Sequence, residues 1–195
     1  MTENKILMDQ SREALKGKWA MVIGTYLIYM LLIIGIQSIK GLGSLASLII
    51  SGPMMVGVAI FSLSIARKQD AYFEQIFKGF KKFEYSLVAY LLIILFIILW
   101  ALLLIVPGII YAISVSQTFY IIAENENIKP KEAINKSKKM MHGYKAKFFY
   151  LCLRFFLWSL LCVLTLGIGF LWLIPWVNVT FAKFYDDIKD NPIPQ

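Results

Sequence analysis

The sequence predicts an all-α, polytopic membrane protein with six transmembrane helices, arranged as three helical hairpins with amphipathic helices at the cytoplasmic interface. Composition is the first reason, because 59% of the 195 residues are hydrophobic and 16% are charged. Soluble domains average about 45–50% apolar and about 25% charged residues. The second reason is residues 85–123, which carry no charged side chain. The third is that basic residues concentrate in the segments between the apolar runs.

Six apolar segments have the length of membrane-spanning helices. A bilayer core is about 30 Å thick, so a spanning helix needs about 20 residues. Residues 85–123 form two such arms around a Pro-Gly pair, and residues 148–182 repeat the design around Gly-Ile-Gly. Arms of this length favour full crossing over re-entrant hairpins, which would give the same charge pattern. The predicted helices are residues 20–38, 44–66, 85–106, 108–123, 148–166 and 168–185.

Glycine and proline mark the predicted hinges of these helices. A Gly-Pro pair within residues 44–66 is expected to kink that helix or break it into two pieces. A small, flexible stretch at residues 40–43 is the expected bend of the first hairpin. The hinge residues are Gly52, Pro53, Pro107, Gly108, Gly167, Gly169 and Pro175.

The positive charge predicts membrane topology rather than nucleic-acid binding. The net charge is +8, and 18 of the 20 basic residues lie in residues 1–18, 67–84 and 129–147 and in the tail after residue 182. All four segments lie on the same side of the predicted hairpins, so the positive-inside rule places both termini in the cytoplasm. These segments also suit contact with a bilayer that has anionic headgroups. Their position beside the apolar runs argues against a nucleic-acid partner.

Three polar segments, residues 3–18, 71–83 and 130–142, are predicted to be helices at the cytoplasmic surface. Trp19 is the expected interfacial anchor of the first. The tail after residue 185 is predicted to be polar and frayed. The apolar faces consist of Leu7, Ser11, Leu15 and Trp19; of Phe73, Ile76, Phe77 and Phe80; and of Ile134, Ser137, Met141, Tyr144 and Phe148.

Each junction of a polar helix with an apolar run also contains a glycine. Gly17, Gly79 and Gly143 are separated by 62 and 64 residues and stand among basic and aromatic side chains. A fixed long period is typical of repeated supersecondary units. The sequence therefore suggests a threefold repeat, residues 5–66, 71–123 and 130–185, within one integral membrane domain of residues 1–195. The alternative is that any series of such hairpins needs similar borders.

Few side chains suggest chemistry. The interiors of the apolar helices contain no Asp, Glu or His, so we expect no enzymatic activity, no metal and no cofactor. We interpret His142 as an interfacial residue rather than a base. Asp186, Asp187 and Asp190 could bind a cation, but a solvated tail is the preferred interpretation.

Arg154 is the outlying charge, seven residues beyond Lys147 and about 10 Å into the membrane on a perpendicular helix. We expect its long stem to snorkel back to the headgroups; otherwise it turns inward to Glu84 or Glu124. Polar residues of the fourth and sixth helices either line a polar path or hold helices together, and packing is preferred. They are Ser114, Ser116, Gln117, Thr118, Asn178 and Thr180.

Three motifs carry a family resemblance: LWALLLIVPGII at residues 99–110, EAINKSKKMMHG at 132–143 and LTLGIGFLWLIPW at 164–176. The chain resembles the bacterial integral-membrane family of unknown function 975, which is similar to membrane domains attached to some glycerophosphodiester phosphodiesterases. The resemblance implies a six-helix protein of the bacterial plasma membrane and supplies no catalytic residue, because the phosphodiesterase chemistry belongs to a separate soluble domain. The family pattern has an acidic residue near Cys152 and a small polar one near Arg154, where this chain departs from it.

The leading functional hypothesis is a non-enzymatic accessory or scaffold in membrane or envelope homeostasis. Its expected partners are the bilayer and either a second copy of the chain or another membrane protein. The alternative is a small channel or carrier for a lipid or amphipathic solute, with a path along the second, fourth and sixth helices. Missing membrane carboxylates argue against a proton- or sodium-coupled transporter.

Overall fold

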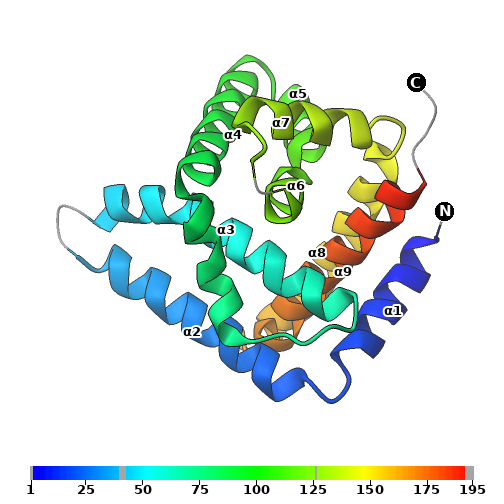
Figure 1. The fold of residues 1–195 in the computed structure, drawn as a ribbon. Helices are drawn as coiled ribbons and strands as arrows, with labels where there is room; N and C mark the ends of the chain where they lie inside the picture. Colours follow the sequence, from blue (N-terminus) through cyan, green and yellow to red (C-terminus); the bar gives the residue numbers. More distant parts are fainter. Residues whose placement is uncertain (1, 40–42, 126, 192–195) are drawn as a thin grey trace.

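The computed structural model describes residues 2–39, 43–125 and 127–191, and every regular element in these ranges is a helix (Figure 1). The expected bend of the first hairpin lies mostly outside the described residues, apart from Gly43. The elements are α1 (Asn4–Leu15), α2 (Trp19–Gln37), α3 (Gly43–Ala66), η1 (Phe73–Lys82), α4 (Phe83–Leu103), α5 (Ile105–Val115), α6 (Thr118–Glu124), α7 (Pro130–Met140), α8 (Lys145–Leu164) and α9 (Phe170–Asp190).

Five helical segments are long and apolar enough to cross a membrane, which is the composition of a membrane protein. The final helix, α9, is outside this set within the described part of the chain, because its second half carries Lys183, Asp186 and Asp187. The sixth span therefore stays a prediction. The five segments are Trp19–Gln37, Gly43–Ala66, Phe73–Leu102, Ile105–Glu124 and Lys145–Leu164.

The long helices form an inner and an outer group. The inner helices α3, α6 and α9 are in contact, with α3 packed against both others (Figure 1). In the most apolar window of each helix, 61% of the residues of α3 are buried within the protein, against 17% in α2 and 22% in α8. The largest core cluster lies where the inner helices meet and includes Phe61, Ile121, Val179 and Tyr185. The outer helices α2, α4 and α8 expose apolar side chains, as lipid contact requires.

The Gly-Pro pair of α3 is a packing surface rather than a break. α3 is one continuous helix with Pro53 inside it, so of the two expected outcomes the break does not occur, and the kink stays a prediction. A Cβ atom on Gly57 would lie 1.6 Å from the Ile76 carbonyl oxygen, and one on Gly79 would lie 1.9 Å from the Pro53 carbonyl oxygen. Backbone therefore meets backbone where η1 crosses α3. Gly52 makes the same kind of approach to Ser86 of α4.

The hairpin bend predicted at Pro107 and Gly108 lies three residues earlier. α4 ends at Leu103, and Leu104 is extended, with φ −160° and ψ 137°. Pro107 and Gly108 belong to the first turn of α5, where a missing N–H costs nothing. The predicted fourth helix is also divided, because α5 and α6 are separated at Ser116 and Gln117.

The last bend contains the predicted hinge glycines, and α9 beyond it is continuous. Leu166 and Gly167 adopt positive φ angles of 53° and 88° between α8 and α9. Gly169 stands beside Cys162, whose Sγ would lie 2.7 Å from a Cβ there. Pro175 is inside α9 and does not end it.

The polar segments are packed onto the protein more closely than predicted. α1 does not simply lie at a membrane surface: it runs along α9 (Figure 1) and is held by Ser11 Oγ to Thr180 Oγ1 at 2.6 Å. The frayed tail is also a wrong prediction for its first five residues, because α9 continues to Asp190 with Ile188 buried. η1 is a 3₁₀ helix, so its three-residue period turns Ile76 and Gly79 toward α3.

Candidate functional site

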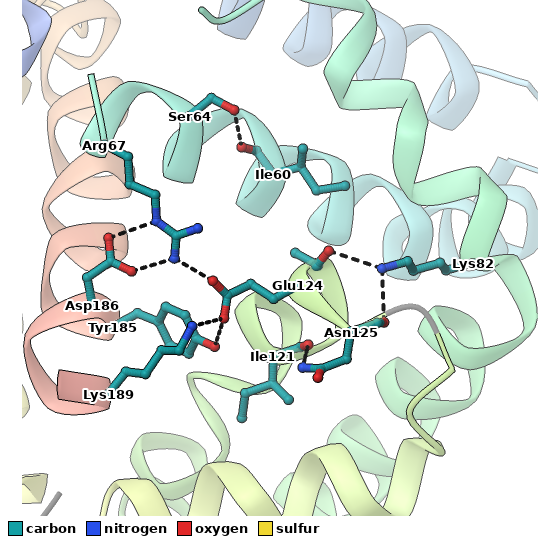
Figure 2. A network of polar contacts seen from close by, with 11 residues as sticks. Ile60, Ser64, Arg67, Lys82, Ile121, Glu124, Asn125, Tyr185, Asp186 and Lys189 are labelled. Atoms are coloured by element: carbon teal, nitrogen blue, oxygen red, sulfur yellow. Dashed lines mark hydrogen bonds and ion pairs between the residues drawn. The ribbon is translucent and has the colours of Figure 1, made fainter. Parts of the chain in front are cut away.

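An ion-pair network joins the ends of the three inner helices (Figure 2). Arg67, directly after α3, donates from Nε and Nη2 to the two oxygens of Asp186 on α9, at 3.2 and 2.6 Å. The same Nη2 donates to Glu124 Oε1 at the end of α6. Glu124 Oε2 accepts from the Tyr185 hydroxyl and from Lys189 Nζ, at 2.5 and 2.8 Å. These five residues are called the ion-pair network below.

The network corrects the interpretation of the aspartates after the sixth predicted helix. Asp186 is held by Arg67, and the Asp187 side chain is only 6% exposed. Neither is part of a solvated tail. Among the described residues no group of three His, Cys, Asp or Glu side chains is placed to hold a metal ion. The network was not predicted from the sequence, although it has a signal: Arg67, Glu124 and Asp186 stand at or near the ends of corresponding helices, and one basic residue faces two acidic ones.

Two lysines directly before outer helices donate to backbone carbonyls at or after the end of an inner helix. Lys18 Nζ donates to the Gln69 carbonyl at 2.9 Å. Lys82 Nζ donates to the carbonyls of Ile122, Ala123 and Asn125, at 2.8, 3.0 and 2.9 Å (Figure 2). The residues of this end of the molecule, called the charged end below, are Lys18, Arg67, Lys82, Glu124, Lys147, Tyr185, Asp186, Asp187 and Lys189.

The charges at this end alter the pKa values of Arg67 and Asp187, which lie outside the predicted spans. Hydrogen bonds to Asp186 and Glu124 outweigh burial and raise the pKa of Arg67. Burial alone would raise the pKa of Asp187, but hydrogen bonds from Thr2 and Lys147 outweigh it and lower that pKa. The Lys147 Nζ to Asp187 Oδ2 distance is 2.9 Å. Both shifts favour the charged forms, so ion pairing stabilises this end of the bundle.

A cavity of about 310 Å³ lies between the inner helices and α2. It brings together two of the predicted polar residues, Ser116 and Asn178. Tyr26, Tyr29 and Tyr120 add polar groups, and the other lining residues are mostly apolar. Asn178 Nδ2 donates to the Ile174 carbonyl, and the Asn178 carbonyl accepts from the Tyr120 hydroxyl at 3.3 Å.

The remaining predicted polar residues are bound within the helices and lie outside this cavity. Ser114, Thr118 and Thr180 donate to backbone carbonyls three or four residues earlier. Gln117 Nε2 donates to Ser116 Oγ, whereas its buried Oε1 has no hydrogen-bond partner among the described residues. These bonds are local to one stretch of chain, so the packing interpretation stays a prediction.

Ser137 of α7 forms hydrogen bonds with the backbone on both sides of the break between α5 and α6. Its hydroxyl accepts from the Gln117 N–H at 3.2 Å and donates to the Ser114 carbonyl at 2.9 Å. Ser137 is fully buried, as its place on the predicted apolar face requires. A serine on that face was a detectable signal of a polar partner.

Arg154 is exposed on α8 and does not turn inward. Glu124, one of its proposed partners, is engaged by Arg67 and Lys189 instead. Arg154 lines a hollow with Lys5, Asp9 and Arg12 of α1. His142 is exposed beyond the end of α7.

The comparisons with known proteins give one family. A family model described as a protein of unknown function, DUF975, matches residues 1–119 and 104–192. The chain belongs to this family. The resemblance predicted from the three motifs is confirmed. Neither the curated proteins nor the solved structures contain a match to the chain.

Proposed function

We propose that this DUF975 protein is a non-enzymatic scaffold or accessory protein of the bacterial plasma membrane, with six spans and both termini in the cytoplasm. One observation carries the proposal: the polar side chains described above bind other parts of the protein. The ion-pair network and the lysines of the charged end hold helices together. Ser114, Thr118 and Thr180 satisfy backbone carbonyls. These groups therefore contribute to rigidity rather than to a reaction.

The proposed scaffold is a closed array of three similar units, residues 5–66, 71–123 and 130–185. Its support is a cyclic packing pattern. Each short helix rests on the inner helix of the preceding unit: η1 on α3, α7 on α6, and α1 on α9. The contact of α1 with α9 joins the first unit to the last and makes the pattern cyclic. Such an array leaves the apolar sides of α2, α4 and α8 available to lipid or to a membrane-protein partner.

Isolation of the protein from its own membranes in nanodiscs tests the scaffold. Native mass spectrometry is expected to show a fixed stoichiometry, either with a second copy or with another membrane protein. Asn178→Leu and Gln117→Leu are expected to alter this assembly, because both residues lie among the inner helices. Lys131→Gln, at an exposed position of α7 outside the apolar sides of α2, α4 and α8, is the control. A monomer without a protein partner in every membrane preparation contradicts the proposal.

The central cavity favours a second candidate function, carriage of a lipid or amphipathic solute. A volume of about 310 Å³ is at the lower limit of ligand pockets, which start at about 300 Å³. This candidate predicts flux of an amphiphile into liposomes that contain the purified protein. If the Ser116→Leu variant loses that flux while its assembly is unchanged, the protein is a carrier and not a scaffold.

A further inference from the structure

Two adjoining hollows form a groove between α1, α8 and α9. Their volumes are about 400 and 380 Å³, and both are lined by Arg12, Trp158, Leu161 and Trp176. The first lies nearer the start of α8 and the second extends to Thr165 after its end. Along α8, Arg154 and Thr165 are eleven residues or about 16 Å apart. The two hollows together are called the α1–α8–α9 groove.

One end of the groove is basic. Lys5, Arg12 and Arg154 line the first hollow, and Asp9 is the one acidic residue among its lining residues. Within the described ranges none of the three cations forms an ion pair. The hollow therefore has an excess of positive charge that the fold itself does not neutralise. Arginine suits a phosphate because its guanidinium can donate two parallel hydrogen bonds.

The other end is apolar and rich in tryptophan. Trp19, Trp158, Trp172 and Trp176 line the groove, which accounts for four of the five tryptophans in the chain. Leu161, Cys162 and Leu173 complete the apolar wall of the second hollow. Tryptophan is typical of the membrane–water boundary, where an apolar ring meets a polar surface.

The basic end and the apolar end of the groove match the charged headgroup and the acyl chains of a phospholipid. α8 is a candidate span, so the groove extends from headgroup depth into the apolar part of the bilayer. A soluble peptide would not reach this depth, whereas lipid surrounds it. We infer that the α1–α8–α9 groove binds a phospholipid with an anionic headgroup, whose phosphate contacts Lys5, Arg12 and Arg154 and whose acyl chain lies against the tryptophans. The groove is separate from the central cavity, so this inference does not depend on the scaffold or on carriage.

Tryptophan quenching measures this binding directly. The protein is placed in phosphatidylcholine nanodiscs with a small share of phosphatidylglycerol that carries brominated chains. Bromine quenches tryptophan on contact, and we expect stronger quenching than from the same share of brominated phosphatidylcholine. Unlabelled phosphatidylglycerol should reverse the excess, whereas unlabelled phosphatidylcholine should not. This measurement uses the unaltered protein, so it does not depend on how a variant folds.

Charge variants then locate the site. Arg12→Gln with Arg154→Gln is expected to weaken the preference for phosphatidylglycerol about tenfold or more, since each tenfold change corresponds to about 1.4 kcal/mol. Lys78→Gln with Lys81→Gln removes the same charge from η1, outside the groove, and should preserve the preference. Thermal unfolding checks that both variants are folded. Equal quenching by the two lipids, or equal effects of the two variants, would overturn the proposal.

Tryptophan variants locate the chain. Trp158→Leu should remove much of the selective quenching, whereas Trp100→Leu should retain it, because Trp100 is equally exposed but lies outside the groove. Retained selectivity in Trp158→Leu and loss in Trp100→Leu would place the lipid elsewhere and overturn the site.

Discussion

Helices α2 and α3 have nearly the same mean hydropathy, 2.2 and 2.1, but opposite places in the molecule. α2 is an outer helix with exposed residues such as Leu31, which is 58% exposed. α3 is central and contacts η1, α4, α6 and α9. The difference is that α3 carries small residues where neighbours cross it, including Gly52, Gly57 and Ala59. Hydropathy thus measures entry into the bilayer, whereas small side chains permit helix contact there.

The largest expected effect is loss of the close crossing of η1 on α3. Gly57→Ala places a methyl group where the Ile76 carbonyl oxygen stands, so the backbones must separate, at a cost of about 3 kcal/mol or more. Gly24→Ala is the control on α2, where a Cβ would meet nothing within 4 Å. There alanine should raise helix stability by up to about 1 kcal/mol. Unfolding titrations in mixed micelles measure both; equal destabilisation would contradict the distinction between inner and outer helices.

The next effect concerns the charged end of the inner helices. Glu124→Gln weakens the acceptor of Arg67, Tyr185 and Lys189 and should lower the free energy of unfolding by about 2 kcal/mol. Glu84→Gln, at an exposed position at the start of outer helix α4, should change it by less than about 0.5 kcal/mol. A double-mutant cycle of Glu124→Gln with Arg67→Gln should give a measurable coupling energy. Additive effects would mean that the Arg67–Glu124 pair contributes no coupling energy.

A smaller, pH-dependent effect is expected at Asp187. Its pKa is lowered in the folded protein, so the unfolded chain binds the proton first as pH falls. The stability from this carboxylate is therefore complete above the ordinary Asp pKa of about 3.9 and is lost as pH falls through the lowered value. Asp187→Asn should flatten the decrease of unfolding free energy below about pH 4, and exposed Asp190→Asn should not. Identical pH profiles would exclude Asp187 as the source.

The smallest effect concerns a hydrogen bond that joins α2 to α3 through side chains of both helices. The Tyr26 hydroxyl and Ser62 Oγ are 3.0 Å apart and buried. A cycle of Tyr26→Phe and Ser62→Ala should give a coupling of about 0.6 kcal/mol, the average for hydrogen bonds between membrane helices. A coupling of several kcal/mol would mean that α2 is held in the bundle as strongly as α3, which contradicts the distinction between outer and inner helices.

Much of the fold was predictable from the sequence, but less of the site was. Apolar runs located the ends of α2, α3 and α8 within three residues of the structure. Pro107 misplaced a bend, because a proline suits a helix start as well as a turn. Asp186 was assigned to a tail, since its partner Arg67 is 119 residues away. Ser116 and Asn178 were assigned to helix packing, with a polar path as the alternative, and only the tertiary structure shows that both line one cavity.

The sequence by itself determined that the chain is an all-α membrane protein of the DUF975 family. Bilayer insertion depends on hydropathy summed over about 20 neighbouring residues, which is a local property. The tertiary structure decided which helices are inner, that the glycines of α3 and η1 meet, and that Arg67 joins Glu124 and Asp186. These features depend on shape and charge between segments far apart in the chain. No local window contains both partners of such a contact.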